Sequence, residues 1–403
     1  MAEVVRAATE ADYPELLPLL ETCFGTGTGP DFERIITLDP WRDPENTRVL
    51  IVDGHVASHV QVHYRPVRFG CAQAVMGGIG HVGTHPDFRK RGYSTRLLND
   101  CIRLMERKGY HLSLLFTGIN DFYAKDGWRT IPTERFSVAA TDVPIWDEPA
   151  VCVRPYGGDD DREARRAIYD TVCHGWLGAL RRTPLYWQRQ PKWARLEGAD
   201  EDARHSLMAE VGGRAVGYAA FRPLSGHLCF EFAALPGCDA AARAMVCALA
   251  RQTVELGGDL LHFDLPPGTQ PHRILADAGV PIELGTSRHY MYRVIDLAGL
   301  LNALAPEFAV RLQEADRAGG RSSFVLDIES HRAAVTIDRA RVHAHPTTSA
   351  PDVCVTQQEF LRALHGYDDG RAALDAAGSG LPHNPLGVLF PRGVHVYAAG
   401  DHF

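Results

Sequence analysis

The segment GHVGTHPDFRKRGYSTRLL, residues 80–98, decides the fold of the N-terminal part of this chain. It reads as a β-strand over HVGTH, a short basic turn over RKRG, and the start of an amphipathic helix. A strand that passes directly into a helix presents free backbone N–H groups and the positive end of the helix dipole in one concavity. The segment therefore predicts an anion-binding cradle of the kind that holds a pyrophosphate.

The cradle draws its charge from the basic turn, and Gly92 lets the backbone approach a phosphate closely. The expected binding residues belong to the strand end, the turn and the first helical turn: Val82, Gly83, Thr84, Arg89, Lys90, Arg91, Gly92, Tyr93 and Ser94. A solvated basic turn without a ligand is the alternative. Other nucleotide motifs fail, because no P-loop occurs and GTGTGP at 25–30 follows a helix. We interpret GTGTGP as a mobile lip.

The sequence around this segment predicts a mixed α/β domain. Residues 13–24 carry apolar side chains at helical spacing, and Asp53-Gly54 predicts a hairpin between two β-rich runs. The glycines of AVMGGIGHVGTHP predict a bulge or a close backbone approach within a strand. Residues 94–107 then read as a helix and HLSLLFTG as a strand.

A similar order of elements follows from Val151 to about Val294. It comprises a strand, an acidic-start helix to His174, a hairpin on Gly212-Gly213, a further strand, an Ala-rich helix and the strand LLHFDLP. We interpret this as a diverged internal duplication. The remainder reads as an α+β unit with one long helix over DLAGLLNALAPEFAVRLQEA and strands over SSFVLDI, AAVTID and DVCVTQ. The apolar tail VHVYAAGDHF predicts a docked end.

Composition excludes several classes of protein. The chain has 403 residues, 45% hydrophobic and 23% charged, with a formal net charge of −8. No apolar run approaches the roughly 18–20 residues of a membrane span, and the N-terminus lacks a signal-peptide pattern, so we expect a cytoplasmic protein. The acidic balance argues against a nucleic-acid partner and is compatible with a cationic one. Nine scattered cysteines without a C-x-x-C pair predict reduced, buried thiols and no metal site.

The pattern R-x-x-G-x-[G/A], here Arg89, Gly92 and Ser94, resembles the acetyl-CoA-binding motif of the GNAT acyltransferases. Ser94 departs mildly from the small glycine or alanine at the last position. DFYAKDGW at 121–128 is similar to the Y-x-x-x-G-[FWY] element that ends GNAT domains. The whole chain resembles one branch, the Eis-like (enhanced intracellular survival) acetyltransferases, and residue-level matching is confined to about 80–130 and the terminus.

The resemblance implies two tandem GNAT-like domains, each a mixed, mostly antiparallel sheet with helices, followed by an α+β domain similar to sterol carrier proteins. The expected boundaries are 1–150 for the catalytic domain, 151–292 for a degenerate second GNAT-like domain and 293–403 for the last domain. The second domain has LPGCDAAARAM where the first has PDFRKRGYSTRL, so we expect it not to bind CoA. Its Trp176, Tyr186 and Trp187 would line an acceptor pocket or subunit contacts, or simply form core.

The resemblance also implies the chemistry. Tyr123 matches the family's general acid, which protonates the leaving thiolate of CoA, although it could merely pack between Phe122 and Trp128. The family uses a terminal aromatic residue whose carboxylate reaches the site, and this sequence ends in Phe403. We expect that carboxylate to orient the acceptor or act as base. His81, His63 and His111 remain alternative bases.

The expected function is acetyl transfer from acetyl-CoA, in a ternary complex, to a primary amine of a cationic acceptor: an aminoglycoside-like compound, a polyamine or a lysine side chain. Family members often form hexamers, so a homo-oligomer is implied. Two alternatives stay open: a non-catalytic protein that binds an apolar ligand, and a tailoring acyltransferase that uses a longer acyl-CoA.

Overall fold

The computed structural model describes residues 2–193, 205–224, 226–317, 319–329 and 331–403. Two compact units account for them, and neither is one continuous stretch of chain. Unit 1 comprises residues 1–131, 288–392 and Phe403, whereas unit 2 comprises residues 132–287 and 393–402. The chain therefore passes between the units near residues 131, 288, 392 and 402. The three-domain division expected from the sequence stays a prediction.

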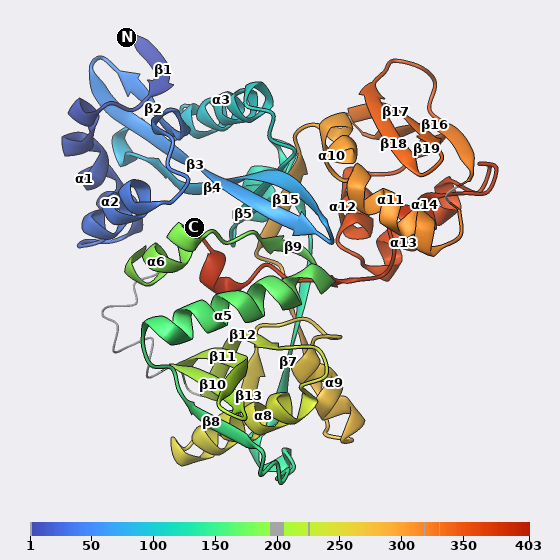
Figure 1. Ribbon diagram of the computed structural model, residues 1–403. Helices are drawn as coiled ribbons and strands as arrows, with labels where there is room; N and C mark the ends of the chain where they lie inside the picture. The colour runs from blue at the N-terminus through green and yellow to red at the C-terminus, as the bar shows by residue number, and fades with distance from the viewer. Residues whose placement is uncertain (1, 194–204, 225, 318, 330) are drawn as a thin grey trace. The chain divides into compact units, whose positions relative to one another are not determined.

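Unit 1 is built on a mixed sheet whose strands run in the order β1-β2-β3-β4-β5-β15-β6 (Figure 1). Neighbours pair antiparallel except β4 and β5, which are parallel. The strands are β1 (Glu3–Ala7), β2 (Thr47–Val52), β3 (His55–Phe69), β4 (Ala72–Thr84), β5 (Leu112–Phe116), β6 (Arg129–Thr130) and β15 (Tyr290–Val294). Strand β15 comes from far along the chain and fills the place between β5 and β6.

Helices cover both faces of this sheet because alternate residues of a strand point to opposite sides. In β2, Leu50 and Val52 pack with α3 (Tyr93–Arg107), while Val49 and Ile51 pack with α1 (Tyr13–Phe24). The helix predicted over 13–24 is confirmed at both ends, and the second begins one residue before its predicted start. The remaining helices of this part are α2 (Gly29–Leu38) and α4 (Asn120–Ala124).

Two of the sequence predictions for this sheet are confirmed. Asp53 and Gly54 adopt positive φ values of 48° and 92° and join β2 to β3 in an antiparallel hairpin. Strand β4 carries the expected bulge, since His59 pairs with Gly83 and Gln61 with Gly80. Two residues of β4 thus face one residue of β3. The predicted loop GTGTGP is shorter than expected, because α2 already begins at Gly29.

The C-terminal part of unit 1 is an α+β segment with the sheet order β18-β17-β16-β19. Its elements are α10 (Leu297–Ala303), α11 (Ala305–Glu314), β16 (Arg321–Ile328), β17 (His331–Asp338), β18 (Arg341–Pro346), β19 (Val353–Cys354), α12 (Gln357–Leu364), α13 (Asp368–Ala377) and α14 (Leu386–Leu389). The single long helix predicted here is wrong. Pro306 lies in the first turn of α11, where its missing N–H costs nothing, and the helix breaks before it.

Unit 2 contains a seven-stranded sheet in the order β14-β7-β13-β12-β11-β10-β8. Its strands are β7 (Thr133–Ala139), β8 (Val151–Pro155), β10 (Ser206–Val211), β11 (Arg214–Leu224), β12 (Gly226–Ala234), β13 (Leu260–Phe263) and β14 (Glu283–Ser287). Its helices are α5 (Asp159–Val172), α6 (Pro184–Trp193), α8 (Asp239–Glu255) and α9 (Gln270–Asp277), and β9 (Trp176–Leu180) pairs in parallel with β20 (Val394–His395).

The two sheets share one plan. In unit 1, a hairpin leads to β4, α3 and a parallel β5; in unit 2, the hairpin on Gly212-Gly213 leads to β12, α8 and a parallel β13. The hairpin predicted on Gly212-Gly213 is confirmed, and both glycines have positive φ. Strand β12 is bulged as well, because Ala220 pairs with Glu231 and Phe221 with Cys229. This agreement is the fold-level counterpart of the internal duplication predicted from the sequence.

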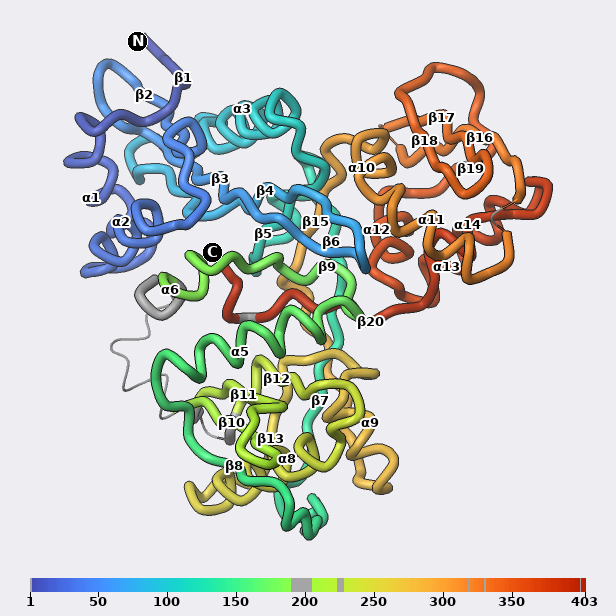
Figure 2. The backbone as a smooth tube through the Cα atoms, in the orientation of Figure 1, coloured from blue at the N-terminus to red at the C-terminus, as the bar shows by residue number. Residues whose placement is uncertain are grey.

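The C-terminal tail is docked, as its apolar sequence predicted. Val396, Tyr397 and Ala398 are buried, and in Figure 2 the red end of the chain runs beside the green segment of β9. Of the two roles considered for Trp176, Tyr186 and Trp187, the structure supports the core role, since all three are buried within unit 2.

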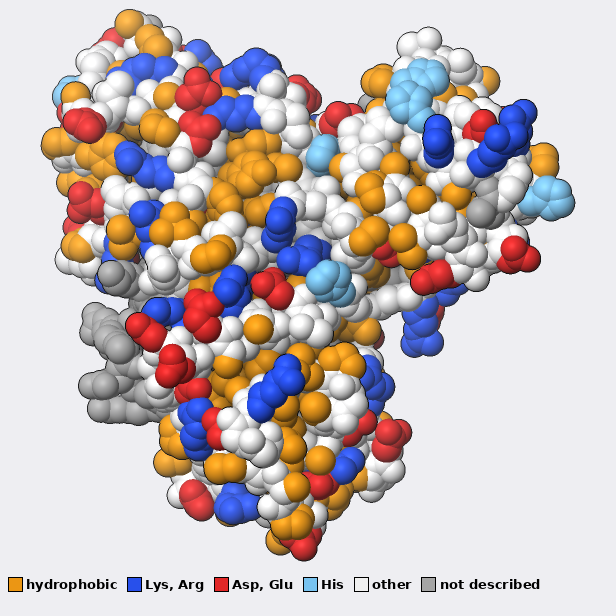
Figure 3. Space-filling view, in the orientation of Figure 1, with side chains coloured by type: hydrophobic (Ala, Val, Ile, Leu, Met, Phe, Trp, Pro, Cys, Tyr) orange, Lys and Arg blue, Asp and Glu red, His pale blue; other side chains and the backbone are white. Residues whose placement is uncertain are grey.

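Other sequence expectations fare differently. The nine cysteines are free, but the expectation that they are buried is wrong for Cys71, Cys152 and Cys354, which are exposed. None of the described helices is long and apolar enough to cross a membrane. Among the described residues, no group of three or more His, Cys, Asp or Glu side chains could hold a metal ion. On the face drawn in Figure 3, basic and acidic side chains are interspersed rather than gathered into a basic stripe.

Candidate active site

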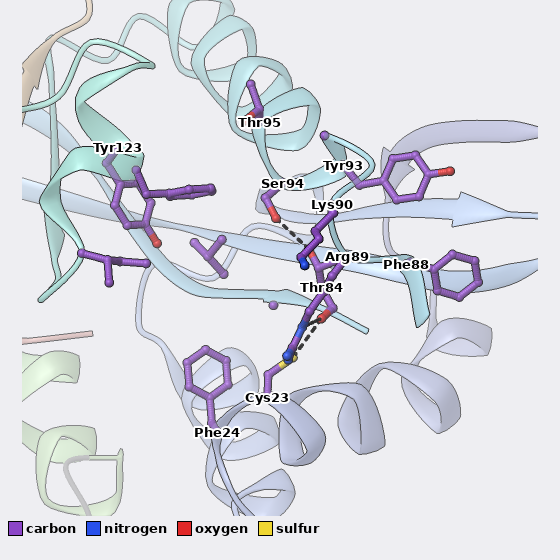
Figure 4. A pocket seen from close by; sticks show the side chains of 15 residues that line it. Cys23, Phe24, Thr84, Phe88, Arg89, Lys90, Tyr93, Ser94, Thr95 and Tyr123 are labelled. Carbon is purple, nitrogen blue, oxygen red and sulfur yellow. Dashed lines mark hydrogen bonds between the residues drawn. The ribbon is translucent and has the colours of Figure 1, made fainter. Parts of the chain in front are cut away.

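A pocket of about 460 Å³ opens in unit 1 where β4 passes into α3. Most of the residues predicted to bind a ligand line it: Val82, Gly83, Thr84, Arg89, Lys90, Gly92, Tyr93 and Ser94. Tyr123 lines it as well (Figure 4). The sequence pattern at 80–98 and the DFYAKDGW element at 121–128, which are separated by a helix and a strand, therefore meet at one cavity.

The turn between β4 and α3 has the backbone that an anion cradle requires. Gly92 caps α3 with φ +76°, a conformation that glycine adopts without a steric penalty, and Lys90 also has a positive φ of 62°. No side chain caps the N-terminus of α3 in the described structure. The N–H groups of its first turn have no acceptor within the helix. They are thus left for a ligand in the pocket that this turn lines.

Polar contacts hold the rim of this cradle in place. The hydroxyls of Thr84 and Ser94 lie 2.7 Å apart, and Arg89 donates from Nε to the carbonyl of Thr84 at 3.2 Å (Figure 4). Ser94, the departure from the expected small residue, therefore ties the helix start to the end of β4.

Arg91 does not line the pocket, although the sequence grouped it with Arg89 and Lys90. Its guanidinium lies over the ring of Phe88, 5.5 Å from the ring centroid, and donates to the carbonyl of Asp87 at 3.0 Å. Two of the three predicted cations thus reach the pocket. A run of basic residues cannot reveal this division, because the turn conformation decides where each side chain points.

The bulge in β4 directs its backbone toward the pocket. His81 has a positive φ of 51° inside the strand, and the two residues after it, Val82 and Gly83, line the cavity. A bulge interrupts the ladder and leaves backbone groups unpaired beside it, which is how the predicted N–H donors become available to a ligand. This geometry supports the binding role predicted for the strand end.

Tyr123 stands on α4 at the opposite side of the pocket from Ser94, with its hydroxyl directed inward (Figure 4). Its ring packs edge-on against Phe122, with centroids 4.9 Å apart, and against Trp128 at 6.4 Å. Burial raises the pKa of Tyr123 to about 12. The hydroxyl is therefore protonated at neutral pH and able to donate a proton.

Phe403 lies in unit 1, against the strand that feeds the pocket. Its ring centroid is 5.1 Å from that of His63 on β3 and 5.1 Å from that of Phe116 on β5. A methyl group on Gly78 of β4 would stand 2.3 Å from Cζ of Phe403, so only glycine admits the ring here. We call the residues around this ring, Gly78, Gly80, His63 and Phe116, the ring socket. Contact with the Phe403 ring, and not only the bulge, explains why β4 has glycine at positions 78 and 80.

A charged network that was not predicted from the sequence adjoins the ring socket through His63. Asp39 accepts from Arg65 Nη1 at 2.8 Å and lies 3.1 Å from Nδ1 of His63. Burial alone would raise the pKa of Asp39, but Arg65 and the His63 hydrogen bond hold it well below its usual range. Burial also lowers the pKa of His63, so its imidazole is neutral at pH 7.

The three histidines proposed as alternative bases occupy different environments. His63 and His81 are neighbours, with perpendicular rings 5.4 Å apart, and burial lowers the pKa of both. Nδ1 of His111 accepts the backbone N–H of Val75 at 3.0 Å, which is a structural role. His63 belongs to the ring socket and His81 lies next to it, whereas no contact of His111 with the socket is seen among the described residues.

Several pocket residues escaped the sequence analysis. Cys23 and Phe24 end α1, and Ile119, Phe122, Phe88 and Thr95 complete the lining. Cys23 and Phe24 directly precede GTGTGP, so the position of that loop at the rim was a usable signal. The apolar residues carried none, because ordinary packing residues look the same in a sequence.

Comparison with known proteins assigns the N-terminal part of unit 1. Residues 4–131 match the family described as an acetyltransferase (GNAT) domain. No curated protein matches the sequence significantly. The domain match ends at Ile131, which is also where the first segment of unit 1 ends.

Solved structures share the fold over the full length of the chain. A protein from Enterococcus faecalis described as a probable N-acyltransferase has a TM-score of 0.75 at 16% identity, covering 100% of both chains. A GCN5-related N-acetyltransferase from Anabaena variabilis reaches 0.73 at 14% identity, also covering 100% of both. Eis1 from Mycobacterium abscessus reaches 0.68 at 16% identity over 100% of both chains. At these identities the likeness concerns the fold, and with the domain match it supports an acetyltransferase.

Proposed function

Because residues 4–131 match the acetyltransferase (GNAT) domain family, we propose that this chain transfers an acetyl group from acetyl-CoA to a primary amine. One observation carries the proposal. The uncapped N-terminus of α3, the cationic residues Arg89 and Lys90, and the buried phenol of Tyr123 all line the same pocket. The first two suit a pyrophosphate and the third suits the thioester end of the same molecule.

The residues present fit acetyl-CoA as co-substrate. Backbone N–H groups at the start of α3, with Arg89 and Lys90, would bind its phosphates through charge-assisted hydrogen bonds. Val82, in the bulge, and Gly83, next to it, would bind its amide-bearing arm. Bound in this way, acetyl-CoA supplies an activated acyl group, and the protein positions it next to Tyr123.

Transfer needs a neutral amine, two protons must leave the amine nitrogen, and one proton must reach the departing thiolate. A base takes one proton from the acceptor's ammonium, the amine nitrogen then bonds to the acetyl carbon as the carbon–sulfur bond breaks, and the second amine proton leaves the product. Tyr123 protonates the departing thiolate. A phenol with a pKa of about 12 donates readily only to a thiolate that is desolvated to a similar degree, which the shared pocket provides.

We place the acceptor beside Phe403. The terminal carboxylate proposed as base or orienter would lie at the ring socket, with His63 as the alternative proton acceptor next to it. The Asp39 hydrogen bond to Nδ1 of His63 leaves Nε2 as the basic atom, as in other carboxylate–histidine pairs. A carboxylate beside the acceptor favours a cationic amine, such as an aminoglycoside-like compound, a polyamine or a lysine side chain.

The full-length likeness to Eis1 supports the finer assignment to an Eis-like arrangement. In this arrangement unit 2 supplies a second GNAT-like sheet that does not bind CoA, and the last part of the chain is a sterol-carrier-like segment. A cytoplasmic homo-oligomer, a hexamer in particular, belongs to the same proposal. The three-domain division of the sequence does as well.

The test measures release of free CoA thiol from acetyl-CoA in the presence of primary amines of each class. We expect thiol release that depends on amine, and a product heavier than the amine by one acetyl group. A parallel series of longer acyl-CoA donors separates acetyl transfer from the tailoring alternative. Tight acetyl-CoA binding without turnover on any amine would contradict the proposal and favour a non-catalytic binding protein.

A further inference from the structure

The tail that carries Phe403 is held by a buried ionic cluster in unit 2. Arg182, in the segment between β9 and α6, donates from Nε to Asp401 Oδ1 at 2.9 Å and from Nη2 to Asp401 Oδ2 at 3.0 Å. The same guanidinium donates from Nη1 to Glu231 Oε1 at 2.8 Å and from Nη2 to Glu231 Oε2 at 2.6 Å. The side chains of the three residues are at most 1% exposed.

Aromatic side chains complete the cluster. The hydroxyl of Tyr186 donates to Asp401, and that of Tyr218 donates to Glu231. The guanidinium of Arg182 lies 4.1 Å from the ring centroid of Tyr169 and 4.7 Å from that of Trp187. We call Arg182, Glu231, Asp401 and Tyr186 the tail latch.

Stability alone does not explain the tail latch. Removing two carboxylates and a guanidinium from water costs several kcal/mol per ion, and well-packed apolar residues of similar volume often do as well or better. What the ionic cluster adds is a fixed geometry, because a guanidinium that makes two hydrogen bonds to each carboxylate admits one arrangement of its partners. The partner that belongs to the tail is Asp401, the third residue from the end of the sequence.

The position of Asp401 gives the tail latch a consequence for the ring socket. Asp401 belongs to unit 2 and Phe403 to unit 1, so the chain passes from one to the other over two residues. Two residues span at most about 7 Å. A tail held at Asp401 therefore leaves only two residues of free chain before the ring of Phe403, whereas a tail released there regains the freedom of all the residues after β20.

We propose that Arg182 is a positioning residue for the acetyl-transfer reaction, acting through Asp401 to hold Phe403 in the ring socket. The inference rests on the proposed function, since it gives the tail latch a role in catalysis. It needs no direct contact between the tail latch and the substrate. Arg182 thus differs from Tyr123, which lines the acetyl-CoA pocket itself.

Paired tyrosines in the cluster offer a matched test. Tyr186→Phe removes the hydroxyl that binds Asp401, while Tyr169→Phe removes a hydroxyl that donates to the carbonyl of Leu180 and leaves Asp401 untouched. A third variant, Asp401→Asn, removes the side-chain charge that Arg182 binds and leaves the terminal carboxylate in place. We expect Tyr186→Phe and Asp401→Asn to lower kcat by about tenfold, with an unchanged KM for acetyl-CoA, and Tyr169→Phe to keep kcat. Equal kcat values for the two tyrosine variants would overturn the proposal.

A double-mutant cycle shows whether the effect passes through Phe403. In a chain that ends at His402, Asp401→Asn should lower kcat no further, because the residue that the tail latch positions is already gone. A full tenfold loss in that background would also overturn the proposal. Hydrogen exchange of residues 393–402 provides a second readout, and should speed up in Tyr186→Phe but not in Tyr169→Phe.

The outcomes separate this inference from the proposed function. If the wild-type chain acetylates no amine, the proposed function fails, and faster exchange of the tail in Tyr186→Phe still establishes the tail latch as an anchor. If the chain acetylates amines and the one-residue truncation keeps full kcat, Phe403 has no role and the positioning of Phe403 by Arg182 is refuted.

Discussion

The bulged strands β4 and β12 occupy equivalent places in the two sheets, but the surroundings of their bulges differ. Beside the bulge of β4 the backbone lines a pocket, and the following turn offers Arg89, Lys90 and an uncapped helix. Beside the bulge of β12 stands Glu231, buried in the tail latch. One unit leaves the bulge accessible to a ligand, whereas the other fills it with its own side chains and binds its own tail.

The turns that follow these strands differ in the same sense. Before α8 the chain has Gly237 with φ +80°, so the backbone can turn as it does at Gly92, but Asp239 rather than a cation begins the helix. A carboxylate at a helix N-terminus occupies the position that favours an anion. The two turns thus share a backbone plan and differ in their side chains, so we predict that the turn of unit 2 does not bind acetyl-CoA.

Tyr123→Phe should have the largest effect on kcat, because it removes the proposed proton donor. It also tests whether the chemistry is confined to unit 1. Loss of the proton donor should lower kcat by about 10²- to 10⁴-fold, while the Kd for acetyl-CoA changes little. Steady-state kinetics with a direct binding measurement check both values. An unchanged kcat would remove Tyr123 from the mechanism, and with it the functional contrast between the two sheets.

Arg89→Ala and Arg243→Ala compare a cation of the turn before α3 with a cation near the start of α8. Arg89 lines the pocket, whereas Arg243 on α8 donates to Glu148. Loss of a charge-assisted phosphate contact should weaken acetyl-CoA binding by about 1–3 kcal/mol for Arg89→Ala, and calorimetry should detect no change for Arg243→Ala. Arg91→Ala, in the same turn as Arg89 but outside the pocket, should weaken acetyl-CoA binding less than Arg89→Ala does. Equal losses in Arg89→Ala and Arg243→Ala would break the comparison.

Gly78→Ala tests the ring socket. The added methyl group would meet Cζ of Phe403 at 2.3 Å, so the ring must leave and kcat should fall as it does on truncation before Phe403. Gly118→Ala is the matched control, because a Cβ there meets nothing within 4 Å. Thermal melting of both variants shows whether the β4 sheet itself survives. Wild-type kcat in a folded Gly78→Ala variant would mean that the ring is not needed there.

The pH dependence of folding stability is the smallest of these expected effects. The pKa of His59 is lowered to about 4 by burial, and burial also lowers the pKa of His63 and His81. Below about pH 6.5 these histidines bind protons in the unfolded chain but stay neutral in the folded one. The free energy of unfolding therefore falls with pH below that value, by about 1.4 kcal/mol per pH unit for each histidine. In unit 2, Arg182 and Arg165 outweigh burial and lower the pKa of Glu231 to about 2.

The sign for Glu231 follows from the same linkage. Its contribution to stability is present above the unfolded pKa of about 4.5 and is lost only as pH falls from there toward 2. Burial also lowers the pKa of His272 and His402 in unit 2, so both units should lose stability as pH falls from about 7 to 5, whereas the contribution of Glu231 itself is lost only below about pH 4.5. His59→Asn should make the decline of unit 1 shallower by one proton, which hydrogen exchange of β3 and β4 measures. An unchanged pH dependence of exchange in that variant would contradict the role of His59.

Local signals in the sequence predicted a large part of this molecule. The hairpin at Asp53-Gly54, both ends of α1 and the bulge of β4 follow from turn residues, apolar spacing and glycines within a few positions of each other. Most of the lining of the pocket could be predicted for the same reason, since its cationic and glycine residues are adjacent in the chain. The break before Pro306 also has a local signal, which is the proline itself.

What the sequence could not reveal depends on pairings between distant segments. The Asp39, His63 and Arg65 network joins a loop to β3, and the tail latch joins residues 182, 231 and 401. No spacing rule connects such positions, because each is a polar residue that would be ordinary on a surface. The choice of β15 as the neighbour of β5 is of the same kind.

The place of β15 in the sheet bears on how the protein is made. Residues 1–131 leave the ribosome first, yet their sheet lacks a strand between β5 and β6 until residues 290–294 follow. Residues 132–287, synthesised in between, hold all the strands of the unit 2 sheet. Vectorial synthesis therefore favours completion of the second sheet before the first, and during that interval β5 presents an open edge to the translation and folding machinery.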